Sequence, residues 1–418
     1  MEEWKEYKLE ELGTVVGGAT PSTKDATNYE GDIPWITPKD LSNHCDRYIY
    51  QGERMITQKG FKSCSCKMLP KDSVLFSSRA PIGYVAIAGG DMCTNQGFKS
   101  IIPNNEVVDN IFLYYLLVHN KARIEGMGSG TTFKEVSGSV MKNVTVSIPE
   151  LQEQKRIADF LSSLDDKIEL NRQINDNLEK QAQALFKSWF VDFEPFKDCE
   201  FVDSELGMIP KIFSIKLISE IPHRLESGRR PKGGASLEGV PSIGAENIKG
   251  LGYYDYSKTK YIPKDFALSV SKGKIKGYEL LIYKDGGKPG YFIPNFTIFG
   301  EGFPFEEMFI NEHVFSLDFF GTNYNIFAYF YMQTPFIMNQ LNSIGGKAAI
   351  PGINSSNVES LPIFDLDNKY IKEFGEITKP IIEEILHNCK TNMNLSHLRD
   401  TLLPRLMSGE LKINEIDC

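Results

Sequence analysis

Side chains that can hydrogen-bond to nucleobases occur in loop-like segments in both halves of the chain. Arg and Lys can donate to guanine O6 and N7, Asn and Gln match adenine N6 and N7, and Ser and Thr can contact a base or a phosphate. The candidates in the first half are Thr20, Ser22, Lys24, Thr37, Lys39, Arg79, Asn95 and Gln96. Those in the second half are Arg229, Arg230, Lys232, Asn247, Lys284 and Lys288. Polar and glycine residues also occupy turns for backbone reasons, so ordinary turn chemistry is the alternative for each of them.

Residue patterns of covalent catalysis are absent from the sequence. The Gly-Gly-Lys triplets at 286–288 and 345–347 lack the spacing and the hydroxyl residue of a phosphate-binding loop. There is no G-x-S-x-G nucleophile turn, no Asn-Pro-Pro-aromatic methyl-transfer motif and no glycine-rich loop of a dinucleotide-binding fold. The six histidines have no partners at metal-ligand spacing. We therefore expect no catalytic residues, no metal site and no cofactor in this chain.

The elements that would position these loops are two long helices, predicted at Leu151–Phe190 and Tyr370–Met407. From Ile157, seam residues recur at every third and fourth position, the a/d pattern of a helix that packs along another helix. The pattern returns 217 residues later. The seam residues of the first helix are Ile157, Leu161, Leu164, Ile168, Asn171, Asn175, Leu178, Ala182, Leu185 and Trp189. Those of the second are Phe374, Thr378, Ile381, Ile385, Asn388, Asn392, Leu395, Arg399, Leu402 and Leu406.

Each seam carries two asparagines at its midpoint. If the helices pack antiparallel, Asn171 lies opposite Asn392 and Asn175 lies opposite Asn388. Asparagine at a seam position lowers stability but fixes the register, because a slipped partner would bury an unpaired amide. The alternative is that these asparagines face solvent at the edge of an ordinary core helix. Their recurrence at the same offset favours the paired arrangement.

The segments before the two helices repeat as well. Short strands punctuated by Gly and Pro precede each helix, which is typical of a β-rich module. The corresponding segments are Gly17–Pro21 and Leu225–Pro231, Ile36–Leu41 and Ile243–Ile248, Phe76–Tyr84 and Tyr283–Tyr291, and Asn95–Ile101 and Asn311–Leu317. The sequence therefore predicts a tandem repeat of a mixed domain followed by a long helix.

Length and composition bound the class of protein. A chain of 418 residues with 41% hydrophobic residues suggests two or more globular domains. The net charge of −9 is unfavourable for nucleic-acid binding, but residues 224–288 carry 13 Lys/Arg against 7 Asp/Glu, and residues 17–99 carry 10 against 8. Seven cysteines without a C-x-x-C pair indicate reduced thiols. The acidic first residues argue against a targeting peptide, and the longest apolar run, Ile111–Val118, is too short to cross a membrane.

The chain resembles the specificity (S) subunits of type I restriction–modification systems. The likeness covers essentially the whole chain, and the two-copy order of its segments is more specific than any single motif. The residues that carry it are Gly17–Ser22, Ile33–Thr37, Asn95–Phe98, Leu151–Gln154 with Ile157, Phe160-Leu161 and Leu164-Asp165, and Leu402–Leu411.

The resemblance implies an α+β fold. Two similar mixed α/β target recognition domains would be separated by two long antiparallel coiled-coil helices, as a pseudo-two-fold tandem repeat. The implied domains are residues 1–149 (first recognition domain), 150–194 (central helix), 195–210 (linker), 211–365 (second recognition domain) and 366–418 (C-terminal helix and tail).

The resemblance also implies a non-catalytic subunit of a cytoplasmic complex on double-stranded DNA. Each recognition domain would read one half of a bipartite site, and the helices would dock two modification (methyltransferase) subunits. These partners would bind S-adenosylmethionine and methylate adenine, while restriction subunits would use ATP and Mg to translocate and cleave DNA. Because Gly228–Pro231 and Ala245–Asn247 depart from their first-half counterparts, the half-sites should differ.

Two other classes of function remain as alternatives. A stand-alone DNA-modifying or DNA-cleaving enzyme with its own recognition domains would need catalytic motifs. A coiled-coil scaffold with lectin-like β domains would have no role on DNA. Only the specificity subunit should bring down a methyltransferase from a lysate.

Overall fold

The computed structural model describes residues 4–42, 44–130, 134–286, 292–346 and 351–415, and it contains two compact units. Unit 1 comprises Met1–Glu169 and Met393–Cys418, and unit 2 comprises Leu170–Asn392. Both boundaries fall inside long helices, α6 (Leu151–Phe190) and α11 (Lys369–Met407), so each unit contains part of both. The helix predictions are confirmed, with α11 beginning one residue earlier than expected. Over the described residues, no helix combines the length and apolar character that a bilayer crossing requires.

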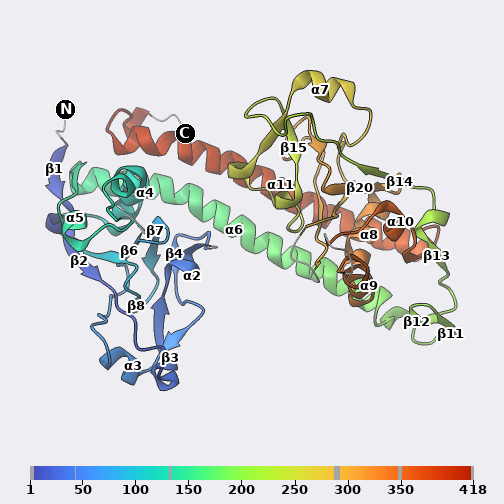
Figure 1. The fold of residues 1–418 in the computed structure, drawn as a ribbon, viewed down its shortest axis with the longest axis horizontal. Coiled ribbons are helices and arrows are strands. Elements are labelled where there is room, and N and C mark those ends of the chain that lie inside the picture. The colour runs from blue at the N-terminus through green and yellow to red at the C-terminus, as the bar shows by residue number, and fades with distance from the viewer. Residues whose placement is uncertain (1–3, 43, 131–133, 287–291, 347–350, 416–418) are drawn as a thin grey trace. The chain divides into compact units, whose positions relative to one another are not determined.

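Unit 1 is built on a five-stranded sheet of order β2-β9-β6-β7-β4, beside a three-stranded sheet of order β5-β3-β8 (Figure 1). Its strands are β1 (Lys5–Lys8), β2 (Gly13–Gly17), β3 (Tyr29–Ile36), β4 (Tyr48–Ile49), β5 (Met55–Ile56), β6 (Val74–Ser78), β7 (Ile82–Ala88), β8 (Cys93–Thr94), β9 (Lys99–Pro103) and β10 (Thr145–Ile148). Its helices, besides its parts of α6 and α11, are α1 (Leu9–Leu12), α2 (Pro38–Ser42), α3 (Gln58–Lys62), α4 (Asn110–Gly126) and α5 (Gly138–Lys142).

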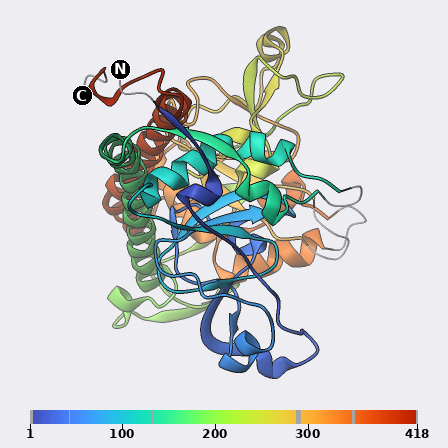
Figure 2. The ribbon, with the colours of Figure 1, turned by 90° about the vertical axis from the view of Figure 1, so that its left-hand side faces the viewer.

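Helix α4 joins the large sheet of unit 1 to the long helices. Its N-cap is Asp109, whose carboxylate accepts hydrogen bonds from the N–H groups of Ile111 and Phe112. Its apolar residues share one core with β6, with Leu161 of α6 and with the last turns of α11. The α3 end of the unit lies away from this core (Figures 1 and 2).

Unit 2 repeats this plan. Its four-stranded sheet has the order β14-β20-β17-β18 and its three-stranded sheet the order β16-β15-β19. The strands are β11 (Phe201–Ser204), β12 (Gly207–Pro210), β13 (Ile215–Leu217), β14 (Arg224–Ser227), β15 (Val240–Ile243), β16 (Lys260–Ile262), β17 (Leu280–Tyr283), β18 (Phe296–Ile298), β19 (Phe309–Ile310), β20 (Val314–Asp318) and β21 (Pro362–Phe364). The helices, besides its parts of α6 and α11, are α7 (Lys264–Ser269), α8 (Thr322–Met332), α9 (Pro335–Gly345) and α10 (Ser355–Glu359).

The strand orders confirm the predicted tandem repeat. Strands β2-β9-β6-β7 correspond to β14-β20-β17-β18, and β5-β3-β8 correspond to β16-β15-β19. Each three-stranded sheet contains one antiparallel and one parallel pair, β3 with β8 in unit 1 and β15 with β19 in unit 2. The fold is therefore the expected α+β tandem repeat.

The segment expected to be a linker, residues 195–210, is partly ordered as a hairpin of β11 and β12. Phe196 and Ile209 from this segment are 3% and 2% exposed and belong to the core of unit 2. Its Pro and Gly residues suggested a domain boundary, but its apolar side chains pack on unit 2.

The helix seams agree with the a/d prediction, since every predicted seam residue is buried or half-buried. In unit 2 the pairs Asn171–Asn392 and Asn175–Asn388 run in opposite directions along α6 and α11, so these parts of the helices are antiparallel. In unit 1, Asp165 of α6 is ion-paired with Arg399 of α11 at 2.5 Å.

Candidate nucleic-acid interface

In unit 1, three loops meet where β3 and β8 end side by side. The two strands are parallel, with Ile36 aligned to Thr94. The Asn95 N–H donates to the Ile36 carbonyl at 2.9 Å, and Asn95 Oδ1 accepts from the Gly97 N–H at 2.8 Å. The loop after β8 is thus fixed to the end of β3 by both its backbone and its first side chain.

The glycine turn after β2 closes onto the same loop. A Cβ atom on Gly18 would lie 2.0 Å from the Asn95 carbonyl oxygen, so only glycine permits this approach. The next N–H, of Ala19, donates to the Thr94 carbonyl at 3.0 Å. This closure brings Thr20 to Gln96, where the Thr20 hydroxyl donates to Gln96 Oε1.

The end of β6 completes the arrangement. The Ser78 N–H donates to the Gly97 carbonyl at 2.7 Å, and Arg79 follows directly. Glu135 lies between two cations, 3.6 Å from Arg79 and 3.3 Å from Lys99. Lys99 is not among the predicted contacts, although it directly follows the Asn95–Phe98 motif and is the first residue of β9.

Four predicted residues of unit 1 do not join this cluster. The Thr37 hydroxyl donates to Asp40 at 2.6 Å and helps to form the turn at the start of α2. Lys39 is ion-paired with Glu53 at 2.5 Å, which raises the pKa of Lys39. Ser22 and Lys24 are exposed in the loop before β3.

Unit 2 has the corresponding loops, and three of the unit 1 hydrogen bonds have counterparts there. The Asn311 N–H donates to the Ile243 carbonyl at 2.9 Å, and Asn311 Oδ1 accepts from the His313 N–H at 2.9 Å. A Cβ atom on Gly228 would lie 1.8 Å from the Ile310 carbonyl oxygen. The Lys284 N–H donates to the His313 carbonyl at 3.1 Å, as Ser78 does to Gly97 in unit 1.

We call these loop residues the loop frame. It comprises residues 18–20, 36, 78–79 and 95–97 in unit 1, and residues 228–230, 243, 284–285 and 311–313 in unit 2. The strand registers place Thr20 and Arg230 at equivalent positions, because Gly17 aligns with Lys99 and Ser227 aligns with Phe315 in corresponding strand pairs. By the same reasoning Gln96 is equivalent to Glu312.

The side chains on the unit 2 loop frame are more strongly charged. Arg230 lies 3.5 Å from Glu312, and His313 Nδ1 lies 2.5 Å from Asp285. The Lys284 ammonium lies 3.0 Å from the Ser227 hydroxyl and 4.8 Å from the centre of the Phe315 ring. A cation therefore lies beside the β6 or β17 end in both units, supplied by Lys99 on β9 in unit 1 and by Lys284 after β17 in unit 2.

Asn247 is not available as a base contact in this structure. Its side chain is 1% exposed, and its Oδ1 accepts from the Gly244 N–H at 3.0 Å. Asp40 makes the same contact with the Thr37 N–H in unit 1, at 2.7 Å. Asn247 therefore shapes the turn after β15, and its selection as a base reader is corrected on this ground.

Arg229 and Lys232 are exposed in the loop after β14. Lys288 lies outside the described residues.

The seam asparagines meet in pairs within unit 2. Asn171 Nδ2 donates to Asn392 Oδ1 at 2.8 Å, and Asn388 Nδ2 donates to Asn175 Oδ1 at 2.9 Å. The Asn175 amide also lies 3.2 Å from the Ile385 carbonyl. The structure thus brings together the two pairs that the antiparallel register predicts.

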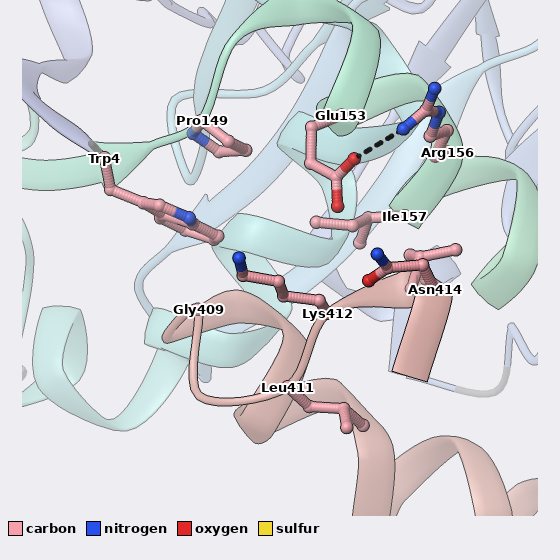
Figure 3. A pocket seen from close by; sticks show the side chains of 10 residues that line it. Trp4, Pro149, Glu153, Arg156, Ile157, Gly409, Leu411, Lys412 and Asn414 are labelled. Carbon is pink, nitrogen blue, oxygen red and sulfur yellow. Dashed lines mark hydrogen bonds and ion pairs between the residues drawn. The ribbon is translucent and has the colours of Figure 1, made fainter. Parts of the chain in front are cut away.

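Elsewhere in unit 1, a cavity of about 580 Å³ lies where α6 begins and α11 ends (Figure 3). Trp4, Ile157 and Lys412 line it, and an ion pair of 3.4 Å joins Glu153 and Arg156 at its wall. None of its lining residues belongs to the loop frame. Among the described residues, no group of three or more His, Cys, Asp or Glu side chains could hold a metal ion.

The comparisons with known proteins identify the class to which this fold belongs. The family described as "Type I restriction modification DNA specificity domain" matches residues 1–180. The type I restriction enzyme MjaIX specificity subunit of Methanocaldococcus jannaschii is 36% identical over 99% of this chain and 95% of its own length. The HindI specificity subunit of Haemophilus influenzae is 24% identical over 98% of this chain and 100% of its own.

A solved structure shows the same fold. The type I restriction–modification S subunit from M. genitalium has a TM-score of 0.58 and 17% identity, and covers 97% of this chain and 96% of its own. The MjaIX relative establishes that the chain belongs to the family of type I restriction enzyme specificity subunits, which are non-catalytic.

Proposed function

We propose that this chain selects the DNA sequence on which a type I restriction–modification complex acts. Unit 1 reads one half of a bipartite site in double-stranded DNA and unit 2 reads the other. The observation that carries this proposal is the loop frame, in which three loop hydrogen bonds and a close glycine approach recur in both units with different side chains at equivalent positions. A constant backbone with variable hydrogen-bonding side chains is suited to reading two different half-sites.

The proposed DNA contacts follow from position and exposure. On the loop frame we assign Thr20, Arg79, Asn95 and Gln96 in unit 1, and Arg230 and Lys284 in unit 2. Lys99 is added because it supplies the cation that Lys284 supplies in unit 2. The exposed or half-exposed residues beside the loop frame, which can contact phosphates, are Ser22, Lys24, Thr37, Lys39, Arg229 and Lys232. Lys288 remains a proposed contact from the sequence alone.

The partners are proposed from the family. Two modification subunits would dock on α6 and α11, bind S-adenosylmethionine and methylate adenine. Restriction subunits would use ATP and Mg to translocate and cleave DNA, and the assembly would work in the cytoplasm. The net charge of −9 supports a division in which the partners supply much of the cationic surface around DNA.

The paired asparagines are proposed to fix the register of α6 against α11. Replacing Asn175 alone by Leu should destabilise the pair by about 1–3 kcal/mol, because the Asn388 amide would lose its partner. Replacing both Asn175 and Asn388 by Leu should restore the stability, but the two helices should then no longer be held in one register. Urea unfolding and cysteine cross-linking across the helices measure the two effects. Equal destabilisation by the single and double changes would contradict the proposal.

The function is tested with the purified chain alone and with its modification subunits. Alone, the chain should bind DNA weakly and with strong dependence on salt, and should show no nuclease or methyltransferase activity. Together with the modification subunits it should bind and methylate one bipartite sequence. Methyl transfer by the isolated chain in the presence of S-adenosylmethionine would contradict the proposal. So would binding by the complex without any preferred sequence.

A further inference from the structure

Two equivalent contacts on the loop frames have different chemistry. Residues 20 and 96 form a neutral hydrogen bond between Thr20 and Gln96 in unit 1. Residues 230 and 312 form an ion pair of 3.5 Å between Arg230 and Glu312 in unit 2. The contact is therefore present in both units, while both of its partners have changed together.

The backbone explains why these positions meet in both units. Thr20 and Arg230 each lie two residues after a glycine, Gly18 or Gly228, that approaches the neighbouring strand end too closely for any side chain. Gln96 and Glu312 each follow an asparagine whose N–H is bonded at 2.9 Å to the end of the adjacent parallel strand. The side chains at these positions are not needed to hold the loops, so they can differ between the units and can contact a ligand.

Each contact leaves hydrogen-bonding groups that match one base. Gln96 is exposed, and with one bond from Thr20 to its Oε1 the carboxamide retains two N–H donors and an acceptor lone pair. That donor and acceptor match adenine N7 and N6. The Arg230 side chain is 63% exposed, and its guanidinium has five N–H groups, one edge of which is engaged by the ion pair with Glu312. The remaining edge matches guanine O6 and N7.

Resting on the proposed function, we propose that these two contacts are the same base-reading position in the two half-sites, with Gln96 selecting adenine and Arg230 selecting guanine. Thr20 and Glu312 are positioning residues, since each bonds to the reading side chain and fixes its orientation. The two half-sites thus differ at this position because a carboxamide in one unit is replaced by a guanidinium in the other.

Reciprocal exchanges in the full complex test this proposal. One variant carries Thr20→Arg with Gln96→Glu, and the other carries Arg230→Thr with Glu312→Gln. Recognised sequences are mapped by adenine methylation and by binding to oligonucleotides that vary one base at a time. The first variant should change one adenine to guanine in the half-site of unit 1, and the second should make the opposite change in the other half-site. The preference at that position should shift by roughly 5- to 150-fold.

The matched control exchanges an exposed ion pair outside the loop frame and outside the long helices, by Lys211→Glu with Glu200→Lys, and should leave every base preference unchanged. If a double variant does not fold, the single variants Gln96→Ala and Arg230→Ala test the proposal instead. Each removes only exposed atoms and should relax the preference at one base. Specific binding with every base preference unchanged would overturn this proposal and leave the proposed function intact. A wild-type complex without a bipartite preference would overturn the proposed function itself.

Discussion

Units 1 and 2 have the same loop frame and different side chains on it. Both frames are held by backbone hydrogen bonds at the end of a parallel strand pair and by a glycine that permits close approach. The exposed positions differ, even in the sign of their charge. Lys39 pairs with Glu53 at 2.5 Å, whereas Glu246, at the position equivalent to Lys39, pairs with Lys260 at 2.5 Å. Because the backbone holds the loops, surface side chains can change without altering loop geometry.

The long helices show the opposite contrast. There the buried side chains, rather than the exposed ones, differ between the two units. In unit 1, Asp165 of α6 lies 2.5 Å from Arg399 of α11, 2.5 Å from the Tyr115 hydroxyl and 3.9 Å from Arg47. Although burial lowers it, the pKa of Arg399 is raised overall by Asp165. The positions equivalent to Asp165 and Arg399 in unit 2 are Ile382 and Ala182, which are fully buried.

Aromatic rings take the place of this ionic cluster in unit 2. Phe186, Phe330 and Phe374 lie with ring centres 5.7–6.0 Å apart, and Phe330 stands where unit 1 has Tyr115. Charges in one core and rings in the other would make exchange of the helix halves unfavourable, since a slipped or swapped half would bury an unpaired charge.

The largest expected effect comes from breaking the ionic cluster of unit 1. Asp165→Leu leaves Arg47, whose side chain is 6% exposed, and Arg399 without their shared carboxylate. This change should lower the free energy of unfolding of unit 1 by about 3–5 kcal/mol. Urea unfolding combined with amide hydrogen exchange measures the loss unit by unit.

The neighbouring Asp166→Ala is the control for that change. Asp166 also pairs with Arg47, but its side chain is 61% exposed, so its loss should cost at most about 1 kcal/mol. Equal losses from Asp165→Leu and Asp166→Ala, or a loss that spreads equally to unit 2, would break the contrast between the two helix cores.

A smaller effect is expected from the frame glycines. Gly18→Ala and Gly228→Ala place a Cβ 2.0 Å and 1.8 Å from a carbonyl oxygen, and should each cost about 1–3 kcal/mol through overpacking. Each variant should weaken reading of its own half-site only, as measured by binding of the complex to single-half-site mutants of the DNA. Gly90→Ala is the control, because a Cβ there would meet nothing within 4 Å. Weakened reading of both half-sites by either variant would contradict the equivalence of the frames.

The smallest effect concerns the cations that both frames share. Lys99→Ala and Lys284→Ala should weaken binding to all sequences alike and reduce the slope of log affinity against log salt by about 1 each, as expected for a phosphate contact. Lys211→Ala, which removes an ion pair of 2.8 Å with Glu200 outside the frames, should leave the slope unchanged. A change of base preference in either frame variant would reassign that lysine to base reading.

Features with a local sequence signal were predictable. The a/d period predicted both long helices and the asparagine pairs, because seam residues recur within a few positions of one another. Contacts to the loop frames from segments distant in the chain were not predictable in this way. Glu135 contacts Arg79 and Lys99 from a segment distant in the chain, and no local pattern marks it. Asparagine is common in exposed turns, so the sequence places Asn247 at the surface. Only its hydrogen bond from the Gly244 N–H shows that it shapes the turn.

The buried ionic cluster of Arg47, Asp165 and Arg399 in unit 1 was not predicted, for the same reason. Arg47 lies in a polar loop, and its partner Asp165 is on a helix 118 residues later in the chain. A buried arginine looks like a surface arginine until the packing around it is known. Two apparent irregularities of the seam, Arg399 among leucines and Asp165 beside Leu164, were the signal available in the sequence.

The most direct test of modular reading is an exchange of residues 211–365 for the matching segment of a related specificity subunit, with α6 and α11 kept unchanged. The complex is assembled with its modification subunits, and adenine methylation is mapped across a genome. Modular reading predicts that one half of the bipartite site changes to that of the donor, while the other half stays as in the parent. A change in both halves, or in neither, would contradict it.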